Sequence, residues 1–94
     1  MNREEILETI VRMLKKSGAC RIALFGSFKR GGEKPGSDID IIVEFSERRS
    51  LLDIVGIEQD LSDAVGRKVD LLTEKSISPY LIDRIKKDSM VIFG

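Results

Sequence analysis

Apolar residues recur at helical spacing in three segments of the chain. In the first segment they lie three or four positions apart, at Ile6, Leu7, Ile10, Val11, Met13 and Leu14. Asn2 can cap this helix, and Ser17-Gly18 can end it. A second helix is predicted from Ser50 to Gly66, with its capping residue and its terminal glycine both in place. A third begins at Ser78-Pro79, since proline suits the first helical turn.

Four shorter apolar or β-branched runs are typical of strands. They are Cys20–Phe25, Asp38–Phe45, Lys68–Leu72 and Met90–Phe93. A short helical piece is expected through about Gly31, before the breakers of 32–36. The order α-β-(α)-β-α-β-α-β predicts an α/β fold with a small mixed β-sheet flanked by helices, in one domain over 1–94. The apolar ending either completes the sheet or pairs across a homo-oligomer.

The amino-acid composition excludes several classes of function. The 94 residues carry 16 basic and 16 acidic side chains and no histidine, so imidazole chemistry and His-based zinc sites are excluded. The zero net charge predicts no direct nucleic-acid binding. A single cysteine excludes an internal disulfide and favours a reducing cytoplasm, and no apolar run is long enough to predict a membrane span. Cys20 is expected to be a buried, inert thiol, and Tyr80 a packing residue rather than a target of self-modification.

The segment from Asp38 to Val43 carries two carboxylates in a β-branched run. Side chains alternate along a strand, so Asp38 and Asp40 would project from one face. Two unit charges about 5 Å apart repel by about 3 kcal/mol at an effective dielectric constant of about 20. Divalent ions turn that repulsion into a binding site, and oxygen ligands favour Mg²⁺ or Mn²⁺. Taken alone, however, Asp-x-Asp is more typical of a solvated strand edge than of a metal site.

Two further features favour the metal site. The strand ending at Phe25 stops at Gly26-Ser27, where a tight turn can deliver N–H groups and a hydroxyl to a phosphate. Asp70 interrupts an otherwise apolar strand, so it either faces water at an edge or is held against a cation. Beside a strand that bears Asp38 and Asp40, it is a candidate third ligand. A phosphate turn followed by a metal-binding strand predicts an enzyme that handles a nucleoside triphosphate.

These motifs together resemble the minimal nucleotidyltransferases of the DNA polymerase β superfamily, over nearly the whole chain. The resemblance is carried by Gly26-Ser27-x-x-Arg30-Gly31, by Ser37-Asp38-Ile39-Asp40 with the strand that follows, and by Asp70. It implies a palm-like fold and attack on the α-phosphate of a nucleoside triphosphate, with release of pyrophosphate. Asp38, Asp40 and Asp70 would be the catalytic metal ligands, with Asp70 near the attacking hydroxyl.

The same resemblance implies a nucleotide site formed by Gly26, Ser27, Arg30 and Ser37. Arg30 remains open between a phosphate contact and a solvated loop residue. The sequence departs from the family at Lys29, where a small residue is common; Lys29 would either add a phosphate contact or crowd the loop.

Minimal nucleotidyltransferases are often paired with a helical HEPN-type protein, and some transfer AMP to a tyrosine of that partner. The resemblance therefore implies an antitoxin-like enzyme that uses ATP and Mg²⁺, with two ions expected. A domain this small has little room to enclose its acceptor, which must come from another molecule. The alternative is a non-catalytic nucleotide-binding or partner-binding antitoxin module. Such a module would have no reason to retain mutually repelling carboxylates.

Overall fold

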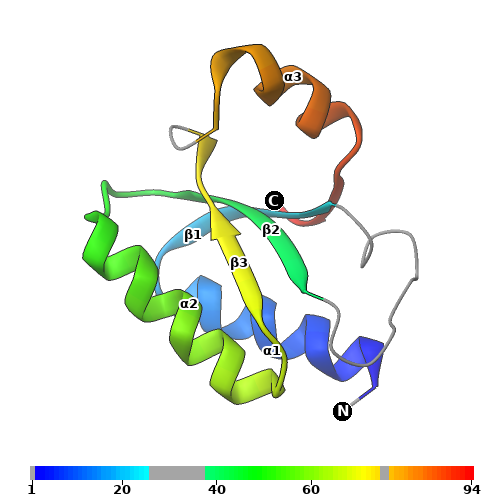
Figure 1. Cartoon of the computed structure of the whole chain (residues 1–94). Helices are drawn as coiled ribbons and strands as arrows, with labels where there is room; N and C mark the ends of the chain where they lie inside the picture. Colours follow the sequence, from blue (N-terminus) through cyan, green and yellow to red (C-terminus); the bar gives the residue numbers. More distant parts are fainter. Residues whose placement is uncertain (1, 26–37, 75–76) are drawn as a thin grey trace.

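The computed structural model describes residues 2–25, 38–74 and 77–94 (Figure 1). Its elements follow the predicted order. They are α1 (Arg3–Lys16), β1 (Ala19–Phe25), β2 (Ile39–Phe45), α2 (Leu51–Val65), β3 (Val69–Leu72), α3 (Pro79–Lys87) and β4 (Met90–Phe93). The short helical piece expected before residue 32 lies outside the described residues.

The four strands form one mixed sheet in the order β3-β2-β1-β4. β1 runs antiparallel to both β2 and β4, whereas β2 and β3 are parallel. A parallel pair needs a crossover connection, and α2 supplies it between β2 and β3. The mixed α/β sheet predicted from the element order is confirmed. β4 pairs with β1, so the apolar ending completes the sheet within this chain.

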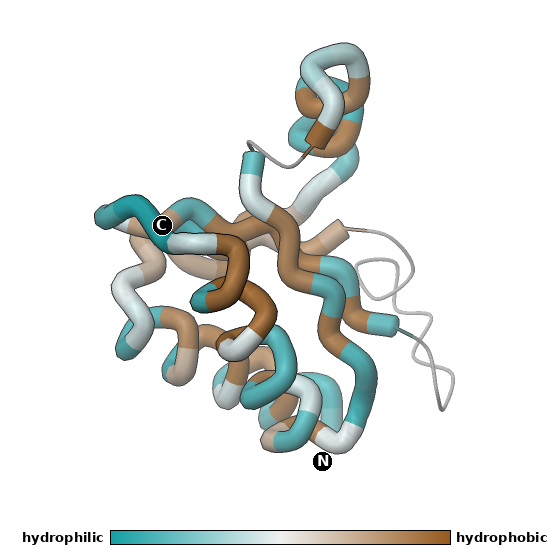
Figure 2. The backbone as a smooth tube through the Cα atoms, turned by 60° about the vertical axis from the view of Figure 1, so that its left-hand side comes forward, coloured by the Kyte–Doolittle hydropathy of each residue, from teal (hydrophilic) through white to brown (hydrophobic). Residues whose placement is uncertain are grey.

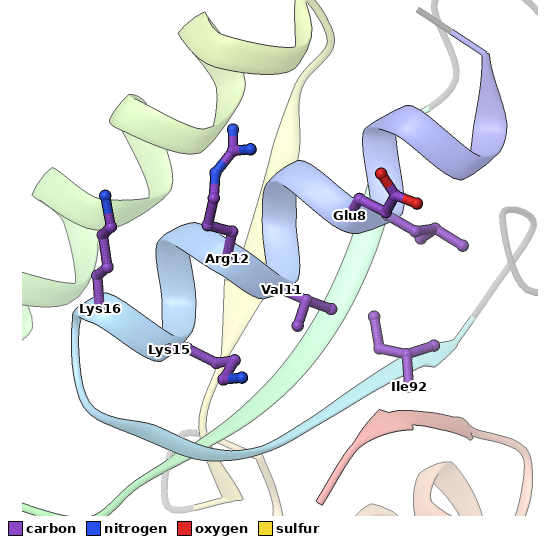
Figure 3. Close-up of a pocket in the computed structure, with 7 residues that line it drawn as sticks. Glu8, Val11, Arg12, Lys15, Lys16 and Ile92 are labelled. Carbon is purple, nitrogen blue, oxygen red and sulfur yellow. The ribbon is translucent and has the colours of Figure 1, made fainter.

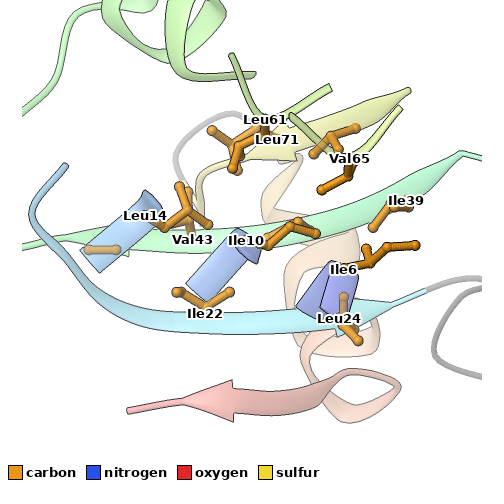
Figure 4. Packing of buried hydrophobic residues seen from close by; sticks show 13 residues of the cluster. Ile6, Ile10, Leu14, Ile22, Leu24, Ile39, Val43, Leu61, Val65 and Leu71 are labelled. Carbon is orange, nitrogen blue, oxygen red and sulfur yellow. The ribbon is translucent and has the colours of Figure 1, made fainter. Parts of the chain in front are cut away.

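Helices α1 and α2 cover one face of the sheet, and α3 lies on the other side (Figure 1). The core fills the space between α1, α2 and the strands (Figure 4). Its fully buried members are Ile10, Leu14, Ile22, Leu24, Ile39, Ile41, Leu61, Val43 and Val69. Figure 2 shows the same pattern as hydrophobic stretches along the central strands. No helix in the described ranges is long and apolar enough to cross a membrane.

The predicted helix ends are observed as caps. The Asn2 side chain accepts a hydrogen bond from the Glu5 N–H at 2.8 Å, and Ser50 caps α2 through the N–H of Asp53. Gly66 ends α2 with a φ of 69°, a left-handed conformation that glycine adopts without steric cost. Gly66 thus fixes where α2 stops, shortly before β3 begins, and so helps to set the position of Asp70.

Two sequence-based expectations about single residues are wrong. Cys20 is exposed, because an irregularity in the β1–β2 pairing between Ala19 and Arg21 breaks the alternation that would have buried it. Its thiol instead donates to the carbonyl of Glu44 at 3.3 Å. Tyr80 is 95% exposed, and none of the residues of α3 is buried. Tyr80 is therefore not a packing residue.

Candidate active site

Asp40 and Asp70 are direct neighbours across the parallel strands β2 and β3. Both are half-buried. The pKa of Asp40 is raised, first by burial and then by the charge of Asp70 and a hydrogen bond between the two carboxyl groups. Such a shift marks a site where negative charge is held at a cost. The two acids that sequence reasoning placed on adjacent strands are therefore brought together.

Strand alternation explains why both acids face away from α1 and α2. The flanking pairs Ile39–Val69 and Ile41–Leu71 point into the core, and each is buried. One position along, Asp40 and its partner must point to the opposite surface of the sheet. The apolar residues thus hold the carboxylate pair in register from beneath.

Asp38 contributes by its charge rather than by close packing. It precedes β2, is exposed, and its charge is a further cause of the raised pKa of Asp40. Within 2–25, 38–74 and 77–94, no group of three or more His, Cys, Asp or Glu side chains is arranged to hold a metal ion. The structure therefore brings Asp40 and Asp70 together as a pair, and the role of Asp38 as a third ligand stays a prediction.

The predicted phosphate-binding residues Gly26, Ser27, Arg30 and Ser37 lie outside the described residues, as does Lys29. Phe25, the last residue of β1, is the register partner of Asp40. β1 therefore ends at the carboxylate pair.

Sequence reasoning missed a cation at the site. The Nζ of Lys68 lies 4.0 Å from Oδ1 of Asp70. The charge of Lys68 also lowers the pKa of Asp40, whereas burial and the neighbouring acids raise it. The signal was present, because residues two apart on a strand share a face.

A second missed feature is the attachment of β3 to α2. β3 is an edge strand, so alternate N–H groups have no strand to bond. The Ser62 hydroxyl accepts from the Val69 N–H at 2.9 Å, and the Glu58 carboxylate accepts from the Leu71 N–H at 2.7 Å. These bonds flank Asp70 on both sides. They fix the backbone that carries it.

A cavity of about 550 Å³ lies elsewhere, between α1 and β4 (Figure 3). Its lining comprises Leu7, Glu8, Val11, Arg12, Lys15, Lys16 and Ile92. Among the described residues, its lining includes none of the three predicted acids Asp38, Asp40 and Asp70, and it lies on the α1 side of the sheet. The carboxylate pair is thus a surface site rather than part of this cavity.

The donor chemistry of the pair fits a hard divalent cation. Mg²⁺ is usually held in proteins by one or two carboxylates and completes its shell with water and substrate phosphates. Two adjacent carboxylates match that pattern. Asp40 and Asp70 could hold such an ion, with Asp38 close enough to act on it electrostatically.

Comparison with known proteins gives the same picture. Residues 4–92 match the family profile of the nucleotidyltransferase domain. The chain is 46% identical over 90 residues to a "Putative protein adenylyltransferase" of Methanocaldococcus jannaschii, covering 96% of this chain and 97% of that protein. It is 32% identical over 93 residues to the protein adenylyltransferase MntA of Thermococcus cleftensis, with 94% of each chain covered.

Solved structures share the fold. A toxin–antitoxin complex with AMP-PNP superposes with a TM-score of 0.84 at 27% identity, covering 94% of this chain and 73% of that chain. A complex of a tri-AMPylated Shewanella oneidensis HEPN toxin with its MNT antitoxin has a TM-score of 0.80 at 23% identity, covering 99% and 73%, which shows the fold alone. With its sheet, its acid pair and its profile match in agreement, the chain belongs to the nucleotidyltransferase domain family and is a nucleotidyltransferase.

Proposed function

We propose that this chain transfers AMP from ATP to a protein hydroxyl, a tyrosine of a HEPN-type partner, and so acts as an antitoxin. The observation that carries the proposal is the register pairing of Asp40 with Asp70 on the sheet face opposite α1 and α2. The names of the relatives support a protein substrate, since they are protein adenylyltransferases. A related toxin–antitoxin complex that binds AMP-PNP supports a nucleoside triphosphate as donor. The cytoplasm is the proposed compartment.

The proposed chemistry uses few protein groups. A divalent ion, Mg²⁺ or Mn²⁺, supplies charge neutralisation at the phosphates, and Asp38, Asp40 and Asp70 would hold it. The acceptor oxygen forms a bond to the α-phosphorus, and the bond to the pyrophosphate leaving group breaks. Asp70 accepts the hydroxyl proton directly or through water. Gly26, Ser27, Arg30 and Ser37 are proposed to bind the triphosphate.

Exposure of the pair lets an external acceptor reach it. The Asp70 side chain is 35% exposed and lies on the surface of the sheet opposite α1 and α2. A hydroxyl on another protein can therefore approach without any opening of the core. Phosphoryl transfer depends mainly on positioning and electrostatics, so the carboxylates, a divalent ion and the bound triphosphate would supply the main requirements of the reaction.

The experiment separates transfer from binding. The purified chain is incubated with a HEPN-type partner, Mg²⁺ and ATP labelled at either the α- or the γ-phosphate. The proposal predicts label on the partner from α-labelled ATP alone, and none in the presence of EDTA. Tyr80→Phe serves as control for self-labelling, because Tyr80 is highly exposed. Tight association without α-label would instead identify a non-catalytic binding module.

A further inference from the structure

We infer that Lys68 is a built-in counter-ion of the carboxylate pair, which occupies the electrostatic place of the metal ion and must be displaced when that ion binds. The inference rests on the proposed metal-dependent function and adds a positioning residue to it. Lys68 thereby sets the affinity of the site for divalent cations.

The geometry places Lys68 on the correct surface. It directly precedes β3, two residues before Asp70, and its carbonyl continues the pairing with β2, so strand alternation places both side chains on the same side of the sheet. Its ammonium nitrogen lies 4.0 Å from Oδ1 of Asp70. The backbone here is fixed as well, because the Lys68 carbonyl accepts from the Ile39 N–H at 2.9 Å, which ties the start of β3 to β2.

The contact is suited to displacement. The Lys68 side chain is 70% exposed, whereas that of Asp70 is 35% exposed. An ion pair at the edge of contact distance with an exposed lysine contributes little to stability, so breaking it costs little. A flexible four-carbon side chain can withdraw into water without any change of backbone. Lys68 thus neutralises the acids in the metal-free protein and yields to a more highly charged ion.

The inference predicts competition between two cations. Lys68 and a divalent ion between Asp40 and Asp70 repel each other across a few ångströms. Removal of the lysine charge should therefore tighten Mg²⁺ binding, by about fivefold for charges near the protein surface. If Lys68 had only a structural role, its substitution would weaken Mg²⁺ binding or leave it unchanged.

The test measures Mg²⁺ binding to metal-free protein by calorimetry, at constant ionic strength and without nucleotide. The variants are Lys68→Gln and Lys68→Arg, with Lys87→Gln as the matched control, since Lys87 is an exposed lysine of α3. The expected Kd falls about fivefold in Lys68→Gln. It stays at the wild-type value in Lys68→Arg and in Lys87→Gln. Thermal melts of all variants check that each is folded.

The outcomes separate this inference from the proposed function. An unchanged or raised Kd in Lys68→Gln overturns the counter-ion role, while wild-type Mg²⁺ binding that Asp40→Asn abolishes leaves the proposed metal site standing. If the wild-type chain binds no Mg²⁺, both the inference and the metal site fail.

Discussion

Phe25 and Asp40 lie directly opposite each other across the antiparallel strands β1 and β2. β1 therefore ends at the carboxylate pair, and β2 begins beside it. The segment that joins these two strand ends carries the glycine, serine and arginine that the sequence predicts to bind phosphate. The chain thus enters and leaves that segment next to Asp40.

Asp40→Asn separates the catalytic role of this residue from a structural one. The substitution removes a repelling charge beside Asp70, so the free energy of unfolding of the metal-free protein should stay the same or rise. Transfer of α-label should fall by about 100-fold or more, because charge stabilisation at the phosphates is lost. Denaturant unfolding and the labelling assay measure the two effects.

The control for that experiment is Asp63→Asn, which changes an exposed acid of α2. It should change neither stability nor transfer. A marked loss of metal-free stability in Asp40→Asn would mean that this acid is structural.

Glu58 is expected to hold Asp70 in place through the backbone. Glu58→Ala leaves the Leu71 N–H without its acceptor, which should lower the free energy of unfolding by about 1–3 kcal/mol. It should also lower transfer, because β3 is an edge strand whose position depends on α2. Glu58→Gln retains an acceptor oxygen and should behave nearly as wild type. Gln59→Ala, an exposed neighbour on the same helix, is the control, and equal effects of both alanine variants would refute the attachment.

Glu44 and Glu74 should give the stability a pH dependence. A hydrogen bond with Glu74 is the main cause that raises the pKa of Glu44, and the same bond is the main cause that lowers the pKa of Glu74. The folded state therefore holds the Glu44 proton more tightly than the unfolded state. Its contribution to stability is present at acidic pH and is lost as pH rises through the raised pKa of Glu44. The positive charges of Arg21 and Lys86 lower the pKa of Glu44 and so partly oppose its upward shift.

Glu44→Gln tests the direction of this pH dependence of stability. The amide can donate to Glu74 at every pH, so the variant should have a higher Tm than wild type at neutral pH. The difference should shrink toward the ordinary pKa of glutamate, 4.5. Glu47→Gln, at an exposed position outside the pair, should show no such trend. A constant difference across the pH series would contradict the shared proton.

Two of the leucines of α2 provide a test of the core. Leu61 is fully buried, whereas Leu52 is 84% exposed. Leu61→Ala should lower the free energy of unfolding by about 2–5 kcal/mol, because it leaves a cavity beneath the sheet. Leu52→Ala should change it by no more than about 0.5 kcal/mol. Denaturant unfolding of the two variants measures both values, and similar losses would contradict the described packing of α2.

Local patterns predicted much of this fold, because each element carries its own signal. The caps at Asn2 and Ser50 and the αL glycine at Gly66 set the helix ends through backbone chemistry within a few residues. The β-branched run around Asp40 predicted one strand, and the apolar neighbours of Asp70 predicted a second strand. Both are confirmed by the register of β2 and β3.

The features that sequence reasoning missed depend on contacts between elements. Glu58 and Ser62 read as ordinary polar residues of a helix, and only the approach of α2 to the edge of β3 makes them acceptors. Cys20 was misjudged because a pairing irregularity cannot be read from alternation. Lys68 is the exception, because its spacing of two residues from Asp70 was a local signal that could have been used.

Anomalous diffraction from crystals soaked with Mn²⁺ and AMP-PNP tests the central claim most directly. We expect an anomalous peak within about 2.2 Å of carboxylate oxygens from both Asp40 and Asp70, with phosphate oxygens completing the shell. That result would join the acid pair and the nucleotide in one site. Bound nucleotide with manganese that touches neither carboxylate would contradict the account.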